Sequence, residues 1–311
     1  MTNKYNTENE MGLFVRMIRE AKGYNQEEIC EGICSLATLS RIETGERMVD
    51  FLTVESLLAR MKVEKSEYEF VLDEEEYELY QQREEIISLI QRQQYDKAKR
   101  KLLYYEKHYG KEVLHQQFVF WQRAWLLQKE GLKSKVQLKE VFLKAIVITA
   151  PKYEQKFKQR EILSNIELSC ITGIFSCIEN SVEKEEKFEE LYKYFQWCKI
   201  KEKLYPVPYR MAMQYYAECL YENKKYELCK KICIEAIQEL SLTSKLENRE
   251  KFFYLKAKAQ EKIGFLLEVE KQQCMNDFLT AYYIREFYNG EEDAKEVEMY
   301  MKERCPWQFI E

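Results

Sequence analysis

Proline and glycine, the residues that most often interrupt helices, are scarce in this chain. Only four prolines and nine glycines occur among its 311 residues. Because both are unfavourable inside helices, their scarcity favours long helices joined by short connections. Charged residues make up 33% of the chain and hydrophobic residues 46%, enough for a sizeable core. We therefore expect an all-α protein, whose length fits two domains.

Long apolar runs are missing too. No stretch approaches the run of about 18 apolar residues that a transmembrane helix requires. The first ten residues, MTNKYNTENE, lack the apolar run of a signal peptide. The sequence therefore predicts a cytoplasmic protein that does not enter a membrane.

Patterns for catalysis and metal binding are also absent from the sequence. It contains no glycine-rich phosphate loop and no serine–histidine–aspartate arrangement, so we expect neither an enzyme nor a cofactor. It has ten cysteines but no CxxC motif, and only two histidines. The pairs Cys30/Cys34 and Cys229/Cys233 would each need two further ligands to hold a metal ion. We interpret the cysteines as reduced packing residues and expect no metal site.

A surplus of positive charge is lacking as well. The formal net charge of the chain is −5. No basic field over the whole molecule would therefore attract nucleic acid, so any contact with DNA must be local.

Residues 12–63 place apolar side chains at helical spacing in four short bursts, separated by polar breaks. The first burst predicts a helix that ends at Gly23, a natural helix stop. Asn25 can cap the second helix, with Glu28 as the reciprocal partner of a capping box. Two further short helices follow, the last from about residue 53 to residue 61. This pattern predicts a small domain of four helices.

The motif RxxxGxNQEEI at residues 19–29 is followed by SxxTLSRIExG at residues 35–45. This string, with its fixed spacing, resembles the Cro/repressor-like (XRE) helix-turn-helix family. Ser35 can cap a third helix, and the resemblance implies that this helix lies in the major groove of DNA. It also implies an internal ion pair between Arg19 and Glu43.

The same resemblance implies which side chains contact DNA. Leu36, Ala37 and Arg41 would face the bases. Arg41 can form a bidentate pair with guanine, whereas the other two can only touch a thymine methyl group. The side chains suited to phosphate contact are Gln26, Ser35, Thr38, Ser40 and Arg47. Two alternatives stay open: Ser35 is needed as a cap even without DNA, and Leu36 can also be interpreted as an ordinary exposed apolar residue.

The charge of this domain is unusual for a DNA-binding protein. Residues 10–65 contain ten acidic and eight basic side chains, a net charge of −2. DNA-binding domains usually carry a positive surplus. We therefore expect weak binding by one copy and a homodimer that engages two half-sites of double-stranded DNA.

Three segments follow one another along the chain. Residues 1–65 form the helix-turn-helix domain, and residues 66–73 form an acidic linker that we expect to be stiff and helical. Residues 74–311 alternate long amphipathic stretches with short breaks. The expected helical hairpins are 74–93 with 95–108, 112–129 with 134–148, 153–178 with 182–203, 208–222 with 225–240, and 246–263 with 266–288, followed by a capping helix at 292–304.

The fourth of these hairpins indicates the type of repeat. Its spacing from Met213 through Ala217 and Tyr226 to Ala236 resembles the tetratricopeptide (TPR) pattern. The two alanines fall where helices cross closely and a small side chain is required. We therefore expect about five TPR-like hairpins stacked into a right-handed α-solenoid.

The first helix of each hairpin lines the concave face of such a solenoid, a groove that suits an extended peptide. Candidate peptide-binding residues on the first helices of the third and fourth hairpins are Arg160, Asn165, Glu167, Tyr209, Arg210, Gln214 and Tyr215. Asn165 lies within an apolar run, where an unpaired amide is costly. The alternative is that Asn165 is partly exposed or bonds a neighbouring helix.

An XRE helix-turn-helix followed by about five TPR-like hairpins resembles the RRNPP family of quorum-sensing regulators, of the Rgg, PlcR and ComR types. The resemblance implies a homodimeric, cytoplasmic transcription factor that binds a short signalling peptide in its TPR groove. Two alternatives remain: a peptide-independent XRE regulator, or a TPR adaptor whose repeats serve dimerisation or partner binding.

Overall fold

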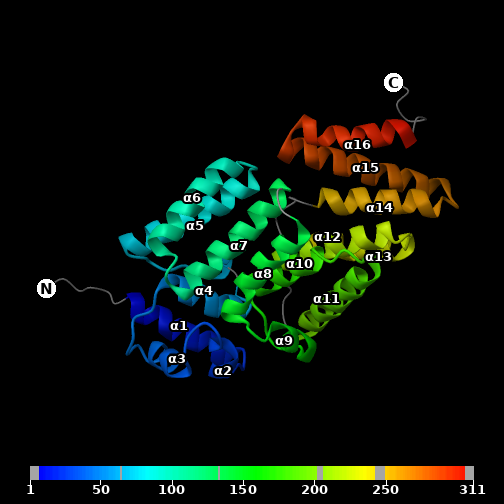
Figure 1. Cartoon of the computed structure of the whole chain (residues 1–311). Helices are drawn as coiled ribbons and strands as arrows, with labels where there is room; N and C mark the ends of the chain where they lie inside the picture. Colours follow the sequence, from blue (N-terminus) through cyan, green and yellow to red (C-terminus); the bar gives the residue numbers. More distant parts are fainter. Residues whose placement is uncertain (1–6, 64, 132–133, 202–205, 242–248, 305–311) are drawn as a thin grey trace. The chain divides into compact units, whose positions relative to one another are not determined.

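The computed structural model describes residues 7–63, 65–131, 134–201, 206–241 and 249–304, and every regular element among them is a helix (Figure 1). The expected all-α fold is therefore confirmed. The chain divides into two compact units. One contains residues 1–177 with 197–205, and the other contains residues 178–196 with 206–311.

The first unit begins with the predicted four short helices. They are α1 (Thr7–Ala21), α2 (Gln26–Cys30), α3 (Leu36–Glu43) and α4 (Phe51–Arg60). The predicted capping box of α2 is present, because the Asn25 side chain accepts the Glu28 amide and Glu28 accepts the Asn25 amide. Gly23 follows α1 with a φ of +72°, a conformation that favours glycine. A buried apolar core, centred on Val15, Leu39 and Leu57, joins the helices.

The connection after α4 differs from the stiff helix that we expected. It contains a single 3-10 turn, η1 (Lys65–Glu67), followed by irregular backbone up to the start of the next helix. Tyr68 and Phe70 pack against Phe14, and Phe70 also meets Phe51 edge to face. We call residues 68–72 the strap. Its aromatic rings join the core of the helix-turn-helix helices, so packing rather than helicity holds it in place.

Six longer or irregular helices complete the main part of the first unit. They are α5 (Glu74–Gln91), α6 (Tyr95–Tyr109), α7 (Val113–Glu130), α8 (Lys135–Thr149), α9 (Tyr153–Gln159) and α10 (Asn165–Ser176). The first two hairpins, α5/α6 and α7/α8, lie where the sequence predicts them. The helix α10 packs against both α7 and α8.

The predicted single helix over residues 153–178 is wrong. α9 ends at Gln159, because the next residue, Arg160, has a φ of +57° that stops the helix. Ser164 then begins α10 with a capping box that Glu167 completes. Gly173 allows α10 to approach α8 closely, because a Cβ there would lie 2.4 Å from the Phe142 ring. A local capping signal therefore overrides the continuous apolar pattern.

The second unit contains most of α11 (Ser181–Lys201), then α12 (Pro206–Glu222), α13 (Tyr226–Ser241), α14 (Glu250–Ile263), α15 (Glu268–Asn289) and α16 (Glu291–Arg304). From α12 to α16 each helix packs against the next (Figure 1). Ala217, Ala236 and Ala281 are fully buried, as expected for small residues at TPR-like helix crossings. The described residues include no helix both long and apolar enough to cross a membrane.

Candidate DNA-binding site

The third helix presents one face to the core and the opposite face to solvent. Leu39 and Ile42 are buried. The predicted base-contacting residues Leu36, Ala37 and Arg41 are all exposed. The structure therefore leaves the outer face of α3 accessible, as a helix that enters the major groove requires.

Hydroxyl groups organise the start of α3. Ser35 caps the helix, because its Oγ accepts the Thr38 amide at 3.0 Å, and it lies 2.8 Å from Thr38 Oγ1. Arg47 Nη1 donates to Thr38 Oγ1 at 3.4 Å. These three predicted phosphate-contacting side chains thus lie together beside the free amide end of α3. Ser40, also exposed, lies farther along the helix.

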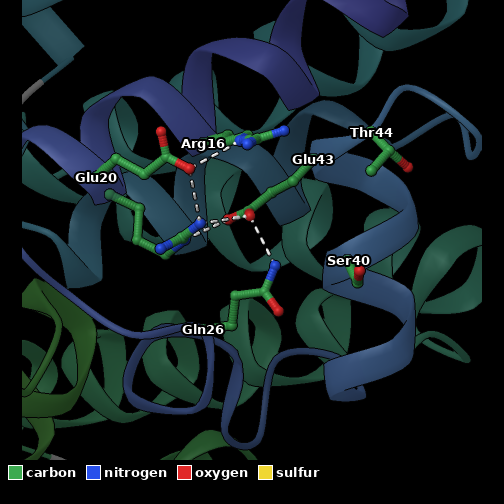
Figure 2. Close-up of a pocket in the computed structure, with 7 residues that line it drawn as sticks. Arg16, Glu20, Gln26, Ser40, Glu43 and Thr44 are labelled. Atoms are coloured by element: carbon green, nitrogen blue, oxygen red, sulfur yellow. Dashed lines mark hydrogen bonds and ion pairs between the residues drawn. The ribbon is translucent and has the colours of Figure 1, made fainter.

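The predicted ion pair between α1 and α3 is present and has a third member (Figure 2). Arg19 donates from Nε to Glu43 Oε1 at 2.7 Å and from Nη2 to Oε2 at 2.8 Å. Gln26 Nε2 donates to the same carboxylate at 2.7 Å. The hydrogen bond to Glu43 is the main cause that raises the pKa of Arg19. Gln26 therefore commits one of its amide N–H groups to the fold.

A polar hollow of about 210 Å³ lies beside this ion pair, and Figure 2 shows how its side chains converge. Its lining consists of Arg16, Arg19, Glu20, Gln26, Ser40, Glu43 and Thr44. Arg16 Nε donates to Glu20 Oε1 at 2.8 Å, and Arg19 is paired with Glu43. Both arginines are therefore neutralised by carboxylates, so the hollow offers little attraction for an anion.

The candidate peptide-binding residues divide between the two units. In the first unit, Arg160 is exposed at the end of α9, and Asn165 is the first residue of α10. Asn165 Oδ1 is buried and has no hydrogen-bond partner within the described part of the chain. An unpaired buried carbonyl oxygen can accept a peptide N–H, so the structure keeps Asn165 as a candidate.

Glu167 does not fit the predicted peptide-binding role. Its side chain is fully buried and bonded to Arg60, and it accepts the Thr149 hydroxyl at 2.7 Å and the Ser164 amide at 2.7 Å. Burial alone would raise the pKa of Glu167, but the charge of Arg60 and these hydrogen bonds lower it below its usual value. Its carboxylate is therefore occupied by the protein itself.

Tyr209, in the second unit, is also unsuited to the predicted role. It is 2% exposed and meets Phe195 edge to face, so its ring belongs to the core. Its neighbours on α12 are half-buried: Gln214 donates to Glu218 at 2.8 Å, and Tyr215 stacks on Phe188. Arg210 is half-buried as well. These three side chains remain candidates for contact with a ligand.

Arg60 is the functional candidate that sequence reasoning missed. It is 1% exposed, although arginine is almost never fully buried without a partner. The available signal was its place next to Met61 at the end of the apolar segment FLTVESLLAR, where a solvent-facing charge is not expected. The partner, 107 positions away, could not be read from the sequence.

Comparisons with known proteins agree with this geometry. Residues 15–68 match the helix-turn-helix family. No curated protein matches the chain. PlcR of Bacillus thuringiensis in complex with the peptide PapR7 and DNA shares 15% sequence identity, with 95% of this chain and 99% of that chain covered and a TM-score of 0.55.

Two ligand-free structures are similar in the same way. Apo PlcR of Bacillus thuringiensis is 12% identical, covers 94% of this chain and 98% of its own, and gives a TM-score of 0.54. Apo ComR of Streptococcus vestibularis is 12% identical, with 96% of this chain and 99% of that chain covered and a TM-score of 0.51. The expected likeness to PlcR and ComR is thus confirmed for the fold. Residues 15–68 thus match the helix-turn-helix family, and over nearly its whole length the chain has the fold of PlcR and ComR.

Proposed function

We propose that this protein is a cytoplasmic RRNPP-type regulator that binds operator DNA as a homodimer and responds to a short signalling peptide. The observation that carries the DNA-binding part is the exposed outer face of α3, where Arg41 lies free to meet base edges. Ser35, Thr38 and Arg47 lie together at the start of that helix and suit a phosphate. Direct base contact and backbone contact are thereby available on one surface.

A second copy follows from electrostatics. The net charge of −2 over residues 10–65 limits the attraction between one domain and DNA. Two copies double the number of phosphate contacts, and helix-turn-helix dimers bind half-sites roughly 34 Å apart. The homodimer is therefore part of the proposal rather than an addition to it.

Peptide control draws support from the fold and from a small set of side chains. PlcR, which has this fold, has been crystallised with the peptide PapR7 and DNA. In this chain Asn165 offers an unpaired buried acceptor, and Arg210, Gln214 and Tyr215 are half-buried on α12. An extended peptide needs donors and acceptors of this kind for its main chain.

The test uses the purified full-length chain. An operator is first selected from a random duplex library, and its affinity is then measured with and without synthetic peptides that match short secreted open reading frames beside the gene. We expect one peptide to change operator affinity by roughly fivefold or more, a usual size for coupling between sites. Asn165→Ala should weaken the response to the peptide and leave peptide-free DNA binding unchanged. Failure of any operator to emerge would refute the DNA-binding proposal.

A peptide-independent regulator is the second candidate, and the structure gives one reason to keep it. Glu167 and Tyr209, two of the seven predicted peptide-binding residues, are buried in protein contacts. If operator binding is specific but no peptide changes it, the repeats serve dimerisation or hold a protein partner.

A further inference from the structure

Helix α4 carries two oppositely charged side chains that point out of the helix-turn-helix core. Glu55 is 7% exposed and Arg60 is 1% exposed. Each finds its partner on a helix beyond the strap. Arg83 Nη2 of α5 donates to Glu55 Oε2 at 2.8 Å, and Arg60 pairs with Glu167 of α10. α4 also packs against α7, so it is one of the places where the DNA-binding helices meet the repeats.

Arg60 is the centre of a buried hydrogen-bond network. Its Nη1 donates to the Ile29 carbonyl at 3.3 Å and also bonds the Glu31 carbonyl, which ties it to the end of α2. Its Nη2 bonds the Glu167 carboxylate and donates to the Thr149 carbonyl at 3.4 Å. One guanidinium thus joins the turn before α3 to α8 and α10.

The network continues on the repeat side. The Thr149 hydroxyl donates to Glu167 at 2.7 Å, and Gln117 of α7 donates to the Thr149 hydroxyl at 2.5 Å. Glu167 also accepts the Ser164 amide and so closes the start of α10. The carboxylate that holds Arg60 is therefore itself fixed by three helices of the first unit.

Backbone shape reinforces the charged contact. Gly32 has a φ of +76°, and a Cβ at this position would lie 2.1 Å from the Thr149 carbonyl oxygen. Lys156, itself buried, forms an ion pair with Glu31. The turn between α2 and α3 is thus seated directly on the end of α8.

This attachment resists small rotations. Removing either partner of a buried ion pair leaves an uncompensated charge away from water, so partial opening is unfavourable. The contacts involve the turn before α3, whereas Leu36, Ala37 and Arg41 on its outer face stay exposed. The helices α7 to α10 of the first unit therefore hold the DNA-binding helices and leave the outer face of α3 exposed.

We infer that Arg60 and Glu167 are positioning residues for operator recognition. They fix the orientation of α3 relative to the helices α8 and α10 of the first unit. The inference rests on the proposed function, because a fixed direction matters only when two copies must reach two half-sites. In a dimer of rigidly mounted domains, the spacing of half-sites that can be engaged together is narrow. Loss of the contacts around Arg60 should widen the range of half-site spacings that the dimer can engage, without altering how one domain binds one half-site.

The experiment measures the affinity of the full-length chain for operators whose spacer is lengthened one base pair at a time, up to half a helical turn, about 5 base pairs. We expect the wild-type chain to lose affinity roughly fivefold or more away from its preferred spacer. In Arg60→Ala this loss should shrink to about twofold, while affinity for a single half-site stays at the wild-type value. A protease should also cleave the strap faster in Arg60→Ala than in the wild-type chain, which tests the attachment of the DNA-binding helices without DNA.

Two glycines supply a matched pair of variants. Gly32→Ala and Gly23→Ala place a side chain at similar backbone angles, φ of +76° and +72°. Only the first meets the Thr149 carbonyl; the second has nothing within 4 Å. We expect Gly32→Ala to reproduce both effects of Arg60→Ala and Gly23→Ala to reproduce neither. Lys101→Ala, which removes an exposed ion pair with Glu85, is the charge control.

The inference is overturned if Arg60→Ala and Gly32→Ala keep the wild-type spacer profile and the wild-type rate of strap cleavage. It is also overturned if half-site affinity falls as far as operator affinity in both variants, because the residues would then merely support the folding of the DNA-binding helices. If the wild-type chain shows no spacer preference, the proposal of two half-sites is contradicted instead. The rate of strap cleavage then still decides whether Arg60 attaches the DNA-binding helices to α8 and α10.

Discussion

At the scale of single residues, Arg41 is the side chain on which sequence specificity depends. It is exposed on α3, and its side chain makes no hydrogen bond or ion pair with any described residue. Arg41→Ala should weaken binding to the selected operator by about 1–3 kcal/mol and relax the preference at one base pair. Anisotropy titrations against all single-base variants of the operator measure both effects.

Arg47→Ala is the control for this prediction. Arg47 lies beside Thr38 at the start of α3, where a phosphate contact is expected. Its loss should lower affinity for every sequence alike, because phosphate contacts carry no base information. Unchanged base preference in Arg41→Ala would show that another residue of α3 reads the operator.

His115 makes the stability of the first unit sensitive to acid. Burial, with the charge of Arg83, lowers the pKa of His115 from 6.5 to about 4, and its Nδ1 lies 2.5 Å from the Tyr105 hydroxyl. As pH falls from 6.5 towards 4, the unfolded chain takes up a proton that the folded chain does not. Stability should therefore be lost across this window, by up to about 3 kcal/mol.

The measurement compares urea unfolding of the wild-type chain and His115→Gln between pH 7 and pH 4.5. The glutamine keeps a partner for Tyr105 but does not titrate, so its stability should fall less as pH decreases. Parallel curves for wild-type and His115→Gln would contradict the assignment.

Residue contacts could be predicted from the sequence only where a motif carried them. The pairing of Arg19 with Glu43 is implied by the resemblance to the XRE helix-turn-helix family, and the structure contains it. The pairing of Arg60 with Glu167 joins residues 107 positions apart, and no local pattern specifies such a contact. The sequence therefore predicts a ligand contact for Glu167, whereas its partner in the structure is Arg60 of the same unit.

At the scale of helices, the cap of α3 is a testable device. The Ser35 side chain accepts the Thr38 amide, and loss of such a cap usually costs about 1 kcal/mol. Ser35→Ala should therefore speed amide hydrogen exchange in α3 within the full-length chain. Ser40→Ala makes the same chemical change inside the same helix, where alanine is the better helix former, and should slow exchange or leave it unchanged. Equal exchange in the two variants would show that Ser35 does not stabilise the helix start.

Helix positions were largely predictable because capping residues and apolar spacing act locally. Asn25, Ser35 and the hairpin α12/α13 lie where the sequence places them. The strap and the break between α9 and α10 were missed for opposite reasons. Aromatic packing holds the strap without helical hydrogen bonds, whereas the capping box at Ser164 divides an apolar run that reads as one helix.

At the scale of the whole molecule, the order of domains could be predicted, but the attachment between them could not. Domain order follows from the motif at residues 19–45 and from the repeating spacing beyond residue 74. The attachment depends on where α4, α8 and α10 meet, which only the folded chain reveals. Net charge, by contrast, is a whole-molecule property that can be read directly from the sequence.

The salt dependence of DNA binding should show that two copies act together. The chain has a net charge of −5, so only local contacts around α3 release counterions from DNA. Each phosphate contact contributes about −0.9 to the slope of log K against log salt concentration. A duplex with both half-sites should therefore give about twice the slope of a duplex with one half-site. Titrations from about 50 to 200 mM salt measure the two slopes, and Lys101→Ala, distant from α3 in the sequence, should leave both unchanged. Equal slopes for the two duplexes would mean that one domain binds at a time, since the second domain of a dimer cannot touch phosphates without adding its own counterion release.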